Sequence, residues 1–402
     1  MTPAHLQKIT QPEVQQFIRE HGMDDVRTLV LKHATLFELP ISIIADQING
    51  RKKIREKVPA YYQTTGIVYP PAVNLEQSSS QRTAEFKLKL LTDFKISGGK
   101  AADLTGGFGI DSWFLSHVFK SVDAVEQDDQ ILSIARHNHT VLGANNITYH
   151  SADSSAFLNE TSSTYDLVFI DPSRRTSTNQ KVFKLSDCSP DIVSLQDRIF
   201  EKSNHLLVKT SPLLDIESGH RELKFVRSVI VVSVEDECKE VLFFSEKGFQ
   251  DEPLITAVNL NENQETFSFH TSEEKNAIAP IADPREYLYE PNASILKAGA
   301  FKSIALKFDL KKIQANTHLY AGSQHLPDFP GRIFKIEAFV KSDMKSILPY
   351  FPEGKGNVAV RNYPLSAVEL KKKTGLKDGG EKYLLGFSGL HKKYLVVANR
   401  LK

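Results

Sequence analysis

The stretch KAADLTGGFGID, residues 100–111, decides the fold of the chain around it. It has the pattern of a short buried strand, a glycine-rich turn and the start of a helix. This order builds a ligand-binding loop at the carboxyl end of a parallel sheet. Gly106, Gly107 and Gly109 allow the backbone to approach a ligand closely and to adopt dihedral angles that a Cβ atom forbids. The stretch therefore predicts an α/β domain with a ligand site at this turn.

The residues after the turn extend the same pattern. Asp111 and Ser112 have the chemistry of helix-capping residues. The next predicted strand, Ser121 to Glu126, ends in a carboxylate that lies 20 residues beyond Gly106. An acidic side chain at about that spacing accepts hydrogen bonds from both ribose hydroxyls of an adenosine-containing ligand. Glu126 is therefore a candidate ribose-binding residue.

Two further predicted strands bring polar side chains to the same rim. The segment 147–150 leads to Asp153, where a polar side chain can meet an adenine amino group. The segment 165–170 ends at Asp171, which begins the sequence Asp-Pro-Ser-Arg-Arg. Because the carboxyl ends of parallel strands share one edge of a sheet, we expect four strand ends to carry polar groups to this edge.

Two cofactor classes suit such a rim, the nicotinamide dinucleotides and S-adenosylmethionine. A dinucleotide site has the pattern G-x-G-x-x-G, so that a helix N-terminus can hold a pyrophosphate. Here the glycines are Gly106, Gly107 and Gly109, with Asp103 before them and Asp111 after them. A pyrophosphate would meet these carboxylates, whereas a ligand with an ammonium and a sulfonium group would be attracted to them. The sequence favours S-adenosylmethionine.

These motifs carry a family resemblance. The segment 103–109 resembles the first motif of class I methyltransferases, and Glu126 resembles their ribose-binding acid. Asp153 is similar to their adenine-contacting residue, and Asp171 with Pro172 resembles their fourth motif. More closely, the chain resembles the methyltransferases with a THUMP-like C-terminal domain, over nearly its whole length. That similarity includes two C-terminal motifs, YEPNASILK at 289–297 and RNYPLS at 361–366.

The resemblance implies an α/β fold with a Rossmann-like, seven-stranded class I methyltransferase domain. An N-terminal helical region precedes it, and small C-terminal α+β modules, ferredoxin-like and THUMP-like, follow it. The expected boundaries of these four parts are 1–60, 61–272, 283–332 and 333–402. The cofactor-binding residues that follow from the resemblance are Gln77, Asp103, Thr105, Gly106, Gly107, Phe108, Gly109, Asp111, Glu126, Gln127, Asp153 and Ser154.

Asp171 is the group that we expect to act on the methyl acceptor, by positioning an exocyclic amine. Pro172 fixes the chain beside it. Methyltransferases of nucleobase amino groups continue this motif with a second proline and an aromatic residue that stacks on the base. This chain has Ser173 and Arg174 instead, and an arginine plane can stack on a base or hold a phosphate. The expected catalytic group is therefore Asp171, Pro172 and Arg174.

The charge of the chain is unevenly distributed. Residues 333–402 contain fourteen Lys or Arg against six Asp or Glu, a net charge of +8, although the whole chain carries only +1. A basic C-terminal module suits the phosphate backbone of RNA, although a lysine-rich solvated surface would look the same. The aromatic residues between these basic groups alternate along predicted strands, which favours a place in the core. The expected substrate-binding residues are Arg175, Lys209, Arg361, Lys371, Lys372 and Lys392.

Other features narrow the function. Cys188 and Cys238 are far apart, so neither a disulfide framework nor a zinc site is expected. His137 and His139 have no acid or cysteine at ligand spacing, which favours surface histidines and no metal. No apolar run approaches the ~20 residues of a membrane helix, and the start lacks the apolar part of a signal peptide. We expect a cytoplasmic protein without a membrane partner.

The sequence thus predicts an S-adenosylmethionine-dependent methyltransferase that modifies a base in structured RNA, either rRNA or tRNA. Two alternatives stay open. One is a protein that binds the cofactor and RNA, or a ribonucleoprotein, without turnover. The other is a methyltransferase for a small molecule or a protein. In the C-terminal part, a helix is expected at Ala293 to Ala300 and a strand at Ala305 to Phe308.

Overall fold

The computed structural model describes residues 2–174 and 184–402, so Arg175, an expected substrate-binding residue, lies outside the described residues. The chain forms two compact units. The first unit comprises Met1–Arg227 and Val241–Gln250, and the second comprises Ser228–Glu240 and Asp251–Lys402. Among the described helices, none has the length and apolar character needed to cross a membrane.

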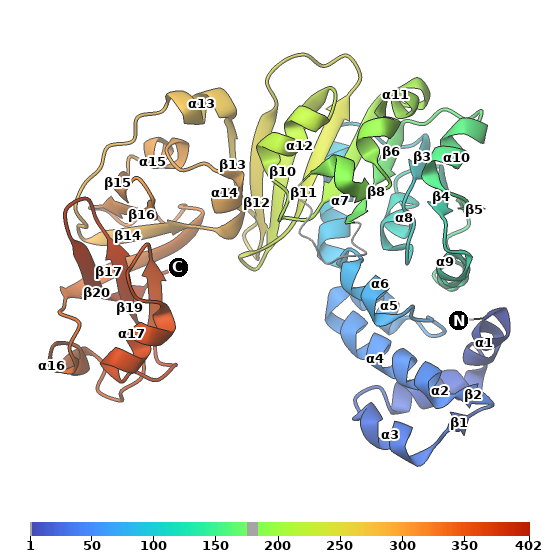
Figure 1. The fold of residues 1–402 in the computed structure, drawn as a ribbon, viewed down its shortest axis with the longest axis horizontal. Helices are drawn as coiled ribbons and strands as arrows, with labels where there is room; N and C mark the ends of the chain where they lie inside the picture. Colours follow the sequence, from blue (N-terminus) through green and yellow to red (C-terminus); the bar gives the residue numbers. More distant parts are fainter. Residues whose placement is uncertain (1, 175–183) are drawn as a thin grey trace. The chain divides into compact units, whose positions relative to one another are not determined.

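The first unit begins with the expected helical region (Figure 1). Pro12 starts a helix at its first position, and Pro40 stands immediately before another helix, as the restricted φ of proline favours. A two-residue strand pair lies between the third and fourth helices. The elements are α1 (Pro3–Ile9), α2 (Pro12–Glu20), α3 (Val26–Lys32), β1 (Thr35–Leu36), β2 (Leu39–Pro40), α4 (Ile41–Lys57) and α5 (Pro59–Gln63).

These helices share one apolar core with the residues around the glycine turn. Ile44 and Ile48 of α4 pack in the same cluster as Tyr61 of α5 and as Phe108 and Trp113. The Tyr61 ring meets the rings of Phe108 and Trp113 edge-on, with both pairs of centroids 5.4 Å apart. The N-terminal helices therefore pack against the residues around the glycine turn and do not form a separate core.

The central sheet of the first unit is largely parallel. Its strands run in the order β5-β4-β3-β6-β9-β11, and only β11 is antiparallel to its neighbour β9. All four residues of β6 are buried, as expected for a strand that is covered on both faces. The strands are β3 (Lys100–Asp103), β4 (Ser121–Glu126), β5 (Ile147–Ser151), β6 (Leu167–Ile170), β9 (His205–Thr210) and β11 (Glu237–Glu246), whose last six residues belong to the first unit.

Helices follow these strands in alternation, so the carboxyl ends of β3, β4, β6 and β9 lie at one rim of the sheet. Several helices begin at an aspartate whose carboxylate accepts backbone N–H groups of the first turn, as Asp128 and Asp153 do. The remaining elements of this unit are α6 (Ala72–Gln77), α7 (Gln81–Asp93), α8 (Ile110–Leu115), α9 (Asp129–Val141), α10 (Ser154–Glu160), β7 (Ser173–Arg174), η1 (Leu185–Asp187), β8 (Cys188–Ser189), α11 (Ile192–Lys202) and α12 (Ile216–Glu222).

The second unit contains two groups of strands. In the first group, β10 (Val226–Val234, mostly in this unit) pairs in parallel with β12 (Leu254–Leu260), and β12 pairs antiparallel with β13 (Glu265–His270). The second group is a seven-stranded sheet in the order β15-β16-β14-β17-β20-β19-β18. One continuous sheet therefore carries both of the small C-terminal modules that the sequence predicts.

Every neighbouring pair in the seven-stranded sheet is antiparallel except β18 with β19. Apolar clusters form on it around Phe334 and Phe387 and around Leu370 and Leu384. Its strands are β14 (Tyr287–Pro291), β15 (Lys311–Gln314), β16 (Thr317–Gly322), β17 (Gly331–Phe339), β18 (Asn357–Arg361), β19 (Lys382–Ser388) and β20 (Lys393–Arg400). The helices of this unit are α13 (Thr271–Asn276), α14 (Ala293–Ala298), α15 (Ser303–Lys307), α16 (Met344–Ile347), η2 (Leu348–Tyr350) and α17 (Ala367–Thr374).

The expected fold class is confirmed: an α/β domain with a large, mostly parallel sheet is combined with an N-terminal helical region and C-terminal α+β domains. One local prediction is wrong. The segment Ala305 to Phe308, expected as a strand, belongs to helix α15 and the residue after it. The Glu274 carboxylate accepts the backbone N–H groups of Lys302 and Ser303, and so holds the start of this short helix.

Candidate functional site

The glycine turn is fixed by hydrogen bonds to both neighbouring strands. The Thr105 N–H donates to Oδ1 of Asp103 over 3.0 Å, and the Gly106 N–H donates to the Val125 carbonyl over 2.8 Å. Gly109 has a φ of +88° and stands as the N-cap of α8 without a side-chain hydrogen bond. The expected capping by Asp111 and Ser112 is therefore wrong, because both residues lie inside α8 and their side chains bind elsewhere.

His139 forms a wall behind this turn. A Cβ atom at Gly109 would lie 2.5 Å from Nε2 of His139, so only glycine fits there. The His139 ring is fully buried, with Nε2 2.8 Å from the Gly109 carbonyl and Nδ1 3.0 Å from the Tyr149 hydroxyl. Burial lowers the pKa of His139 to about 4, so the ring is neutral at neutral pH. The prediction of a surface histidine was wrong for His139, although His137 is half-buried and bonds to the Gly66 carbonyl.

Glu126 stands at the end of β4 and joins the next strand end to the turn. Its Oε2 accepts the Gly107 N–H over 2.9 Å, and its Oε1 accepts the Asp128 N–H over 2.9 Å. Each carboxylate oxygen can accept a further hydrogen bond, because each has a second lone pair. Glu126 is therefore held in a fixed orientation beside the glycine turn, and its carboxylate can still accept hydrogen bonds from hydroxyl groups.

The other residues expected at the adenosine end have different environments. Gln127 is exposed, and Asp153 is an exposed N-cap whose Oδ1 accepts the Ser155 N–H over 2.8 Å. The Ser154 hydroxyl is buried and donates to the Leu104 carbonyl over 2.8 Å. Asp153 is therefore open to solvent, while the Ser154 side chain fastens α10 to the end of β3.

Of two further expected cofactor-binding residues, Phe108 is buried and Gln77 is exposed. Phe108 is 3% exposed, and its ring packs against Tyr61 in the core, so only its backbone remains for a ligand. Gln77 is exposed at the end of α6. The two residues before it are held in place, because the Lys57 ammonium donates to the Leu75 and Glu76 carbonyls over 2.6 and 2.8 Å.

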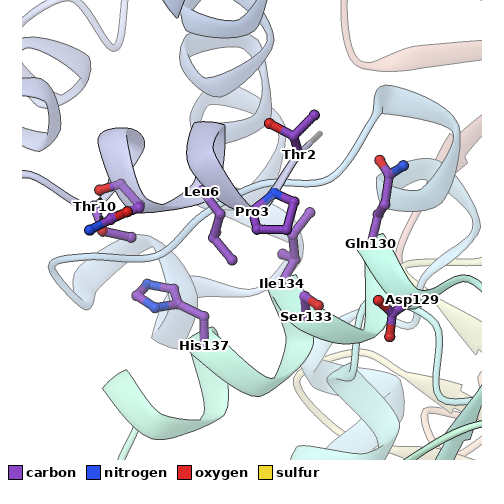
Figure 2. Close-up of a pocket in the computed structure, with 10 residues that line it drawn as sticks. Thr2, Pro3, Leu6, Thr10, Asp129, Gln130, Ser133, Ile134 and His137 are labelled. Atoms are coloured by element: carbon purple, nitrogen blue, oxygen red, sulfur yellow. Dashed lines mark hydrogen bonds between the residues drawn. The ribbon is translucent and has the colours of Figure 1, made fainter.

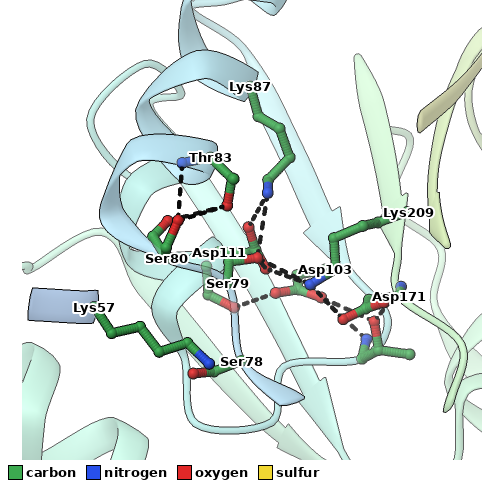
Figure 3. Close-up of polar contacts among 12 residues, drawn as sticks. Lys57, Ser78, Ser79, Ser80, Thr83, Lys87, Asp103, Asp111, Asp171 and Lys209 are labelled. Atoms are coloured by element: carbon green, nitrogen blue, oxygen red, sulfur yellow. Dashed lines mark hydrogen bonds and ion pairs between the residues drawn. The ribbon is translucent and has the colours of Figure 1, made fainter. Parts of the chain in front are cut away.

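A buried group of charges lies at the carboxyl rim of the sheet, and we call it the lysine–aspartate cluster (Figure 3). Its members are Ser79, Lys87, Asp111, Asp171 and Lys209. Lys87 Nζ lies 3.0 Å from Oδ1 of Asp111, and Lys209 Nζ lies 3.5 Å from Oδ2 of the same carboxylate and 2.6 Å from Oδ2 of Asp171. The Ser79 hydroxyl donates to Asp111 over 2.6 Å and accepts from Lys209 over 2.9 Å.

The carboxyl groups of this region differ in their ionisation. Burial raises the pKa of Asp111, but Lys87 and Lys209 outweigh it and hold the value at about 2, so the group is ionised. Burial raises the pKa of Asp103 to about 7, against the opposing hydrogen bond from Ser112. Burial also raises the pKa of Asp171, and Lys209 opposes that shift. Asp103 therefore changes its charge near neutral pH.

Asp171 is tied to the glycine turn as well as to the cluster. Its backbone N–H donates to the Thr105 hydroxyl over 2.7 Å, and its side chain is 31% exposed. Pro172 is buried beside it. The next two residues form β7, where the backbone of Arg174 pairs with Cys188 of β8. The expected catalytic loop is therefore hydrogen-bonded to the turn that is expected to hold the cofactor.

The structure thus brings together, in the first unit, the expected residues Asp103, Thr105, Asp111, Asp171 and Lys209. Lys87 joins them although the sequence analysis missed it. The available signal was its place on the buried face of α7, where it is 4% exposed among Thr83, Ala84, Phe86 and Leu91. A lysine at a core position of an amphipathic helix indicates a buried acidic partner.

The remaining expected substrate-binding residues lie in the second unit. The Arg361 guanidinium is paired with the buried carboxylate of Glu290, and Lys371 is paired with Asp378. Lys372 is exposed on α17, and the exposed Lys392 has its ammonium 5.0 Å from the centre of the Tyr394 ring. Among the aromatic residues of this region, Tyr394 and Phe387 are buried in the core, as the sequence favoured.

A separate cavity of about 320 Å³ lies between α1 and α9 (Figure 2). Leu6 and Ile134 supply apolar walls, and Asp129 and His137 supply polar ones. It contains none of the residues predicted to bind a cofactor or substrate. Within residues 2–174 and 184–402, no three His, Cys, Asp or Glu side chains are grouped so that they could hold a metal ion.

Comparisons with known proteins agree with this architecture. Residues 287–330 match a family of ferredoxin-like domains, and residues 331–400 match a family of THUMP domain-like sequences. The whole chain is similar to the crystal structure of a "putative methyltransferase" from Porphyromonas gingivalis W83. The two share 27% identity, each chain is covered completely, and the TM-score is 0.86. No curated protein matches the chain.

Part of the chain is also similar to smaller solved structures. One is a "putative RNA methyltransferase" from Pyrococcus horikoshii, with 19% identity over 48% of this chain and 98% of that one, at a TM-score of 0.35. Another is an rRNA methylase from Streptococcus thermophilus, with 15% identity over 40% of this chain and 97% of that one, at a TM-score of 0.30. At such low TM-scores these two similarities carry no further argument.

The raised pKa of Asp103 predicts a pH dependence of stability. The folded state keeps the Asp103 proton up to about pH 7, whereas the unfolded state releases it near pH 4. Stability should therefore fall as the pH rises through this range, by at most about 1.4 kcal/mol per pH unit. His139 contributes the opposite slope, because its pKa is lowered. The Asp103→Asn variant should accordingly lose less stability than the wild type between pH 5 and pH 7.5.

Denaturant titrations at the two pH values measure this difference, and the contribution of His139 cancels between the two proteins. Asp123→Asn is the matched control, since Asp123 is also buried but has a lowered pKa. It should reduce stability by the same amount at both pH values. Parallel losses for the wild type and Asp103→Asn would show that Asp103 is already ionised at pH 5.

The contact between Gly109 and His139 predicts a large cost for a single methyl group. Gly109→Ala should destabilise the protein by about 3–5 kcal/mol, because it adds a clash with His139 to the strain of a positive φ. Gly143→Ala is the control, with a φ of +79° and no atom of the described part of the chain within 4 Å of the added methyl group, and should cost only about 1–2 kcal/mol. Equal unfolding free energies for the two variants would contradict the claim that the His139 ring fills the space beside Gly109.

Proposed function

We propose that this protein is an S-adenosylmethionine-dependent methyltransferase that modifies a base in structured RNA, rRNA or tRNA, in the cytoplasm. One observation carries the proposal. Glu126 is bonded to the Gly107 N–H, and the Asp171 backbone is bonded to the Thr105 hydroxyl of the same turn. A candidate ribose acceptor and a candidate group for the methyl acceptor are therefore fixed to a single loop, as a transfer between two bound molecules requires.

The residues at the turn fit an adenosine-containing cofactor. Gly107 has a φ of +50°, and among the described residues a Cβ atom there would have only the Thr105 carbonyl, 3.8 Å away, within 4 Å. The backbone at this point is thus open to a ligand. Glu126 would hold the ribose hydroxyls, and the exposed Asp153 would meet the adenine amino group. S-adenosylmethionine, when bound, supplies an electrophilic methyl group, and the protein supplies orientation and proton transfer.

Asp111 is not available to attract the cofactor, although its charge suggested that role. The sequence argument had it attracting the ammonium of the cofactor, but its carboxylate is neutralised by Lys87 and Lys209. We therefore assign Asp111 to the support of the site. Asp103, whose charge changes near neutral pH, and the carboxyl groups of Glu126, Asp153 and Asp171 are the other acidic groups of this rim that favour a cationic cofactor.

On the acceptor side, Asp171 combines exposure with an ion pair. Its carboxylate is 31% exposed, so an acceptor can reach it, while Lys209 holds one of its oxygens. The other oxygen can accept a hydrogen bond from an acceptor N–H and can take its proton. Arg174 follows in the backbone of β7, and arginine is a residue type whose chemistry suits a base plane or a phosphate.

The support for RNA comes from the second unit. Residues 331–400 match THUMP domain-like sequences, and residues 333–402 carry a net charge of +8. Lys372 and Lys392 are exposed there, and phosphate contacts need exposed cations. Similarity over the full length to one "putative methyltransferase" supports methyl transfer as the reaction class.

Glu126 gives a direct test of the cofactor. Glu126→Gln should weaken S-adenosylmethionine binding about 10- to 100-fold, because an amide replaces one acceptor oxygen by a donor. Isothermal titration calorimetry of the full chain measures this change. Glu160→Gln, at the exposed end of α10, removes an acidic charge elsewhere in the unit and should leave the affinity unchanged. Equal affinities for wild type and Glu126→Gln would remove Glu126 from the site.

Asp171 gives the test of the reaction. The wild-type protein should transfer a radiolabelled methyl group from S-adenosylmethionine to total RNA from cells that lack this protein. Asp171→Ala should reduce the rate at least about 100-fold, which is the usual contribution of a positioned proton acceptor. Its affinity for the cofactor, followed by calorimetry, should change little. Binding of the cofactor without any label in RNA would instead favour a protein that binds without turnover or that uses another acceptor.

A further inference from the structure

The ammonium group of Lys209 is enclosed by polar side chains of the same unit. It is the penultimate residue of β9, and its side chain is only 7% exposed. Its ammonium lies 2.6 Å from Asp171 Oδ2, 2.9 Å from the Ser79 hydroxyl and 3.5 Å from Asp111 Oδ2 (Figure 3). These partners come from three segments that are distant in sequence. A side chain so enclosed is poorly placed to contact a macromolecule.

Four charged groups face Asp171. Lys209 reaches it from β9, Lys87 from α7, Asp111 from α8 and Asp103 from the end of β3. Lys209 is in direct contact with the carboxylate, whereas Lys87 is bound to Asp111. Burial favours the neutral form of Asp171, the charge of Asp111 adds to that effect, and Lys209 is the strongest opposing group. The ionised form of Asp171 therefore depends mainly on Lys209.

We propose that Lys209 is a positioning residue that keeps Asp171 ionised and correctly oriented for the methyl acceptor, rather than a residue that contacts RNA. This inference rests on the proposed function. The sequence analysis expected Lys209 to bind the substrate, because it lies at the end of a strand. The structure favours a different role, because side chains of the same protein already contact its ammonium group. The conservative substitute is arginine, which keeps the charge, and methionine has a similar length without it.

The same arrangement defines a class of acceptor. An ionised carboxylate is a hydrogen-bond acceptor only, so it suits a reacting atom that carries a hydrogen, such as an exocyclic amine. A ring nitrogen that has only a lone pair would offer Asp171 nothing to bind. The proton that the acceptor loses passes to Asp171 and then to solvent through its exposed side, so no further reactant is needed. We infer an acceptor with an N–H or O–H group.

The pH dependence of methyl transfer distinguishes this role from a structural one. Initial rates are measured with radiolabelled S-adenosylmethionine and a fixed, subsaturating amount of total RNA from cells that lack the protein, between pH 5.5 and 9.5. Lys209→Met should move the acidic limb of the profile upward by at least one pH unit. Its rate at pH 7 should be at least tenfold lower than the wild-type rate and should recover towards the wild-type value at high pH. Lys209→Arg should restore most of the wild-type profile.

Lys100→Met is the matched control, because Lys100 forms a 2.7 Å ion pair with the buried Asp123 at the opposite end of the strands. Its profile should keep the wild-type shape. Two results would overturn the proposal. One is a Lys209→Met rate that is reduced equally at every pH. The other is a Lys209→Arg variant that behaves like Lys209→Met.

A second measurement does not depend on activity. Lys209→Met should lower the melting temperature at pH 8, because it leaves a buried carboxylate without its partner. Adding Asp171→Asn to that variant should raise the melting temperature again. Additive losses in the double variant would contradict the pairing of Lys209 with Asp171. A wild-type protein that puts no label into RNA would instead contradict the proposed function, whatever the melting temperatures show.

Discussion

The buried contact between Lys209 and the carboxylates of Asp171 and Asp111 is the interaction on which the site depends. It joins the end of β9 to the loop after β6 and to the first turn of α8. Ser79 adds the segment between α6 and α7. Removing one partner from a buried charge pair leaves the other uncompensated, which usually costs several kcal/mol. The cluster therefore makes four distant segments depend on one another at the rim of the sheet.

The glycine turn is held by a second set of contacts that are mostly uncharged. His139 occupies the space that a side chain at position 109 would need, and it is neutral because it is buried. The carboxyl groups of Glu126 and Asp103 accept the Gly107 and Thr105 N–H groups of the turn. The ion pairs therefore lie on the side of Asp171, and the cofactor side is shaped by backbone and by these two oriented carboxyl groups. This division suits a site that binds two molecules of different chemistry.

The sequence predicted those parts of the fold that local patterns determine. The strand at Ser121 to Glu126 was predicted with the bounds that the structure has, because a short apolar run sits between a turn and a capping aspartate. The helix at Ala293 begins as expected, since Asn292 caps it locally. In contrast, the helix at Ser303 to Lys307 begins on the carboxylate of Glu274, 28 and 29 residues away, and no local pattern records that contact. The burial of His139 behind Gly109 and the pairing of Arg361 with Glu290 were missed for the same reason.

At the site, strand ends and glycine spacing located the rim, but only the fold could show that Asp111 is neutralised by Lys87 and Lys209.

The central claim is that one rim holds an adenosine cofactor at Glu126 and presents Asp171 to the acceptor. A crystal structure of the full chain with S-adenosylhomocysteine, the product form of the cofactor, tests it most directly. We expect both ribose hydroxyls on the Glu126 carboxylate, the adenine near Asp153, and the sulfur on the side of Asp171. Density for the ligand at another place, such as the cavity between α1 and α9, or a ribose that leaves Glu126 without contact, would contradict the account.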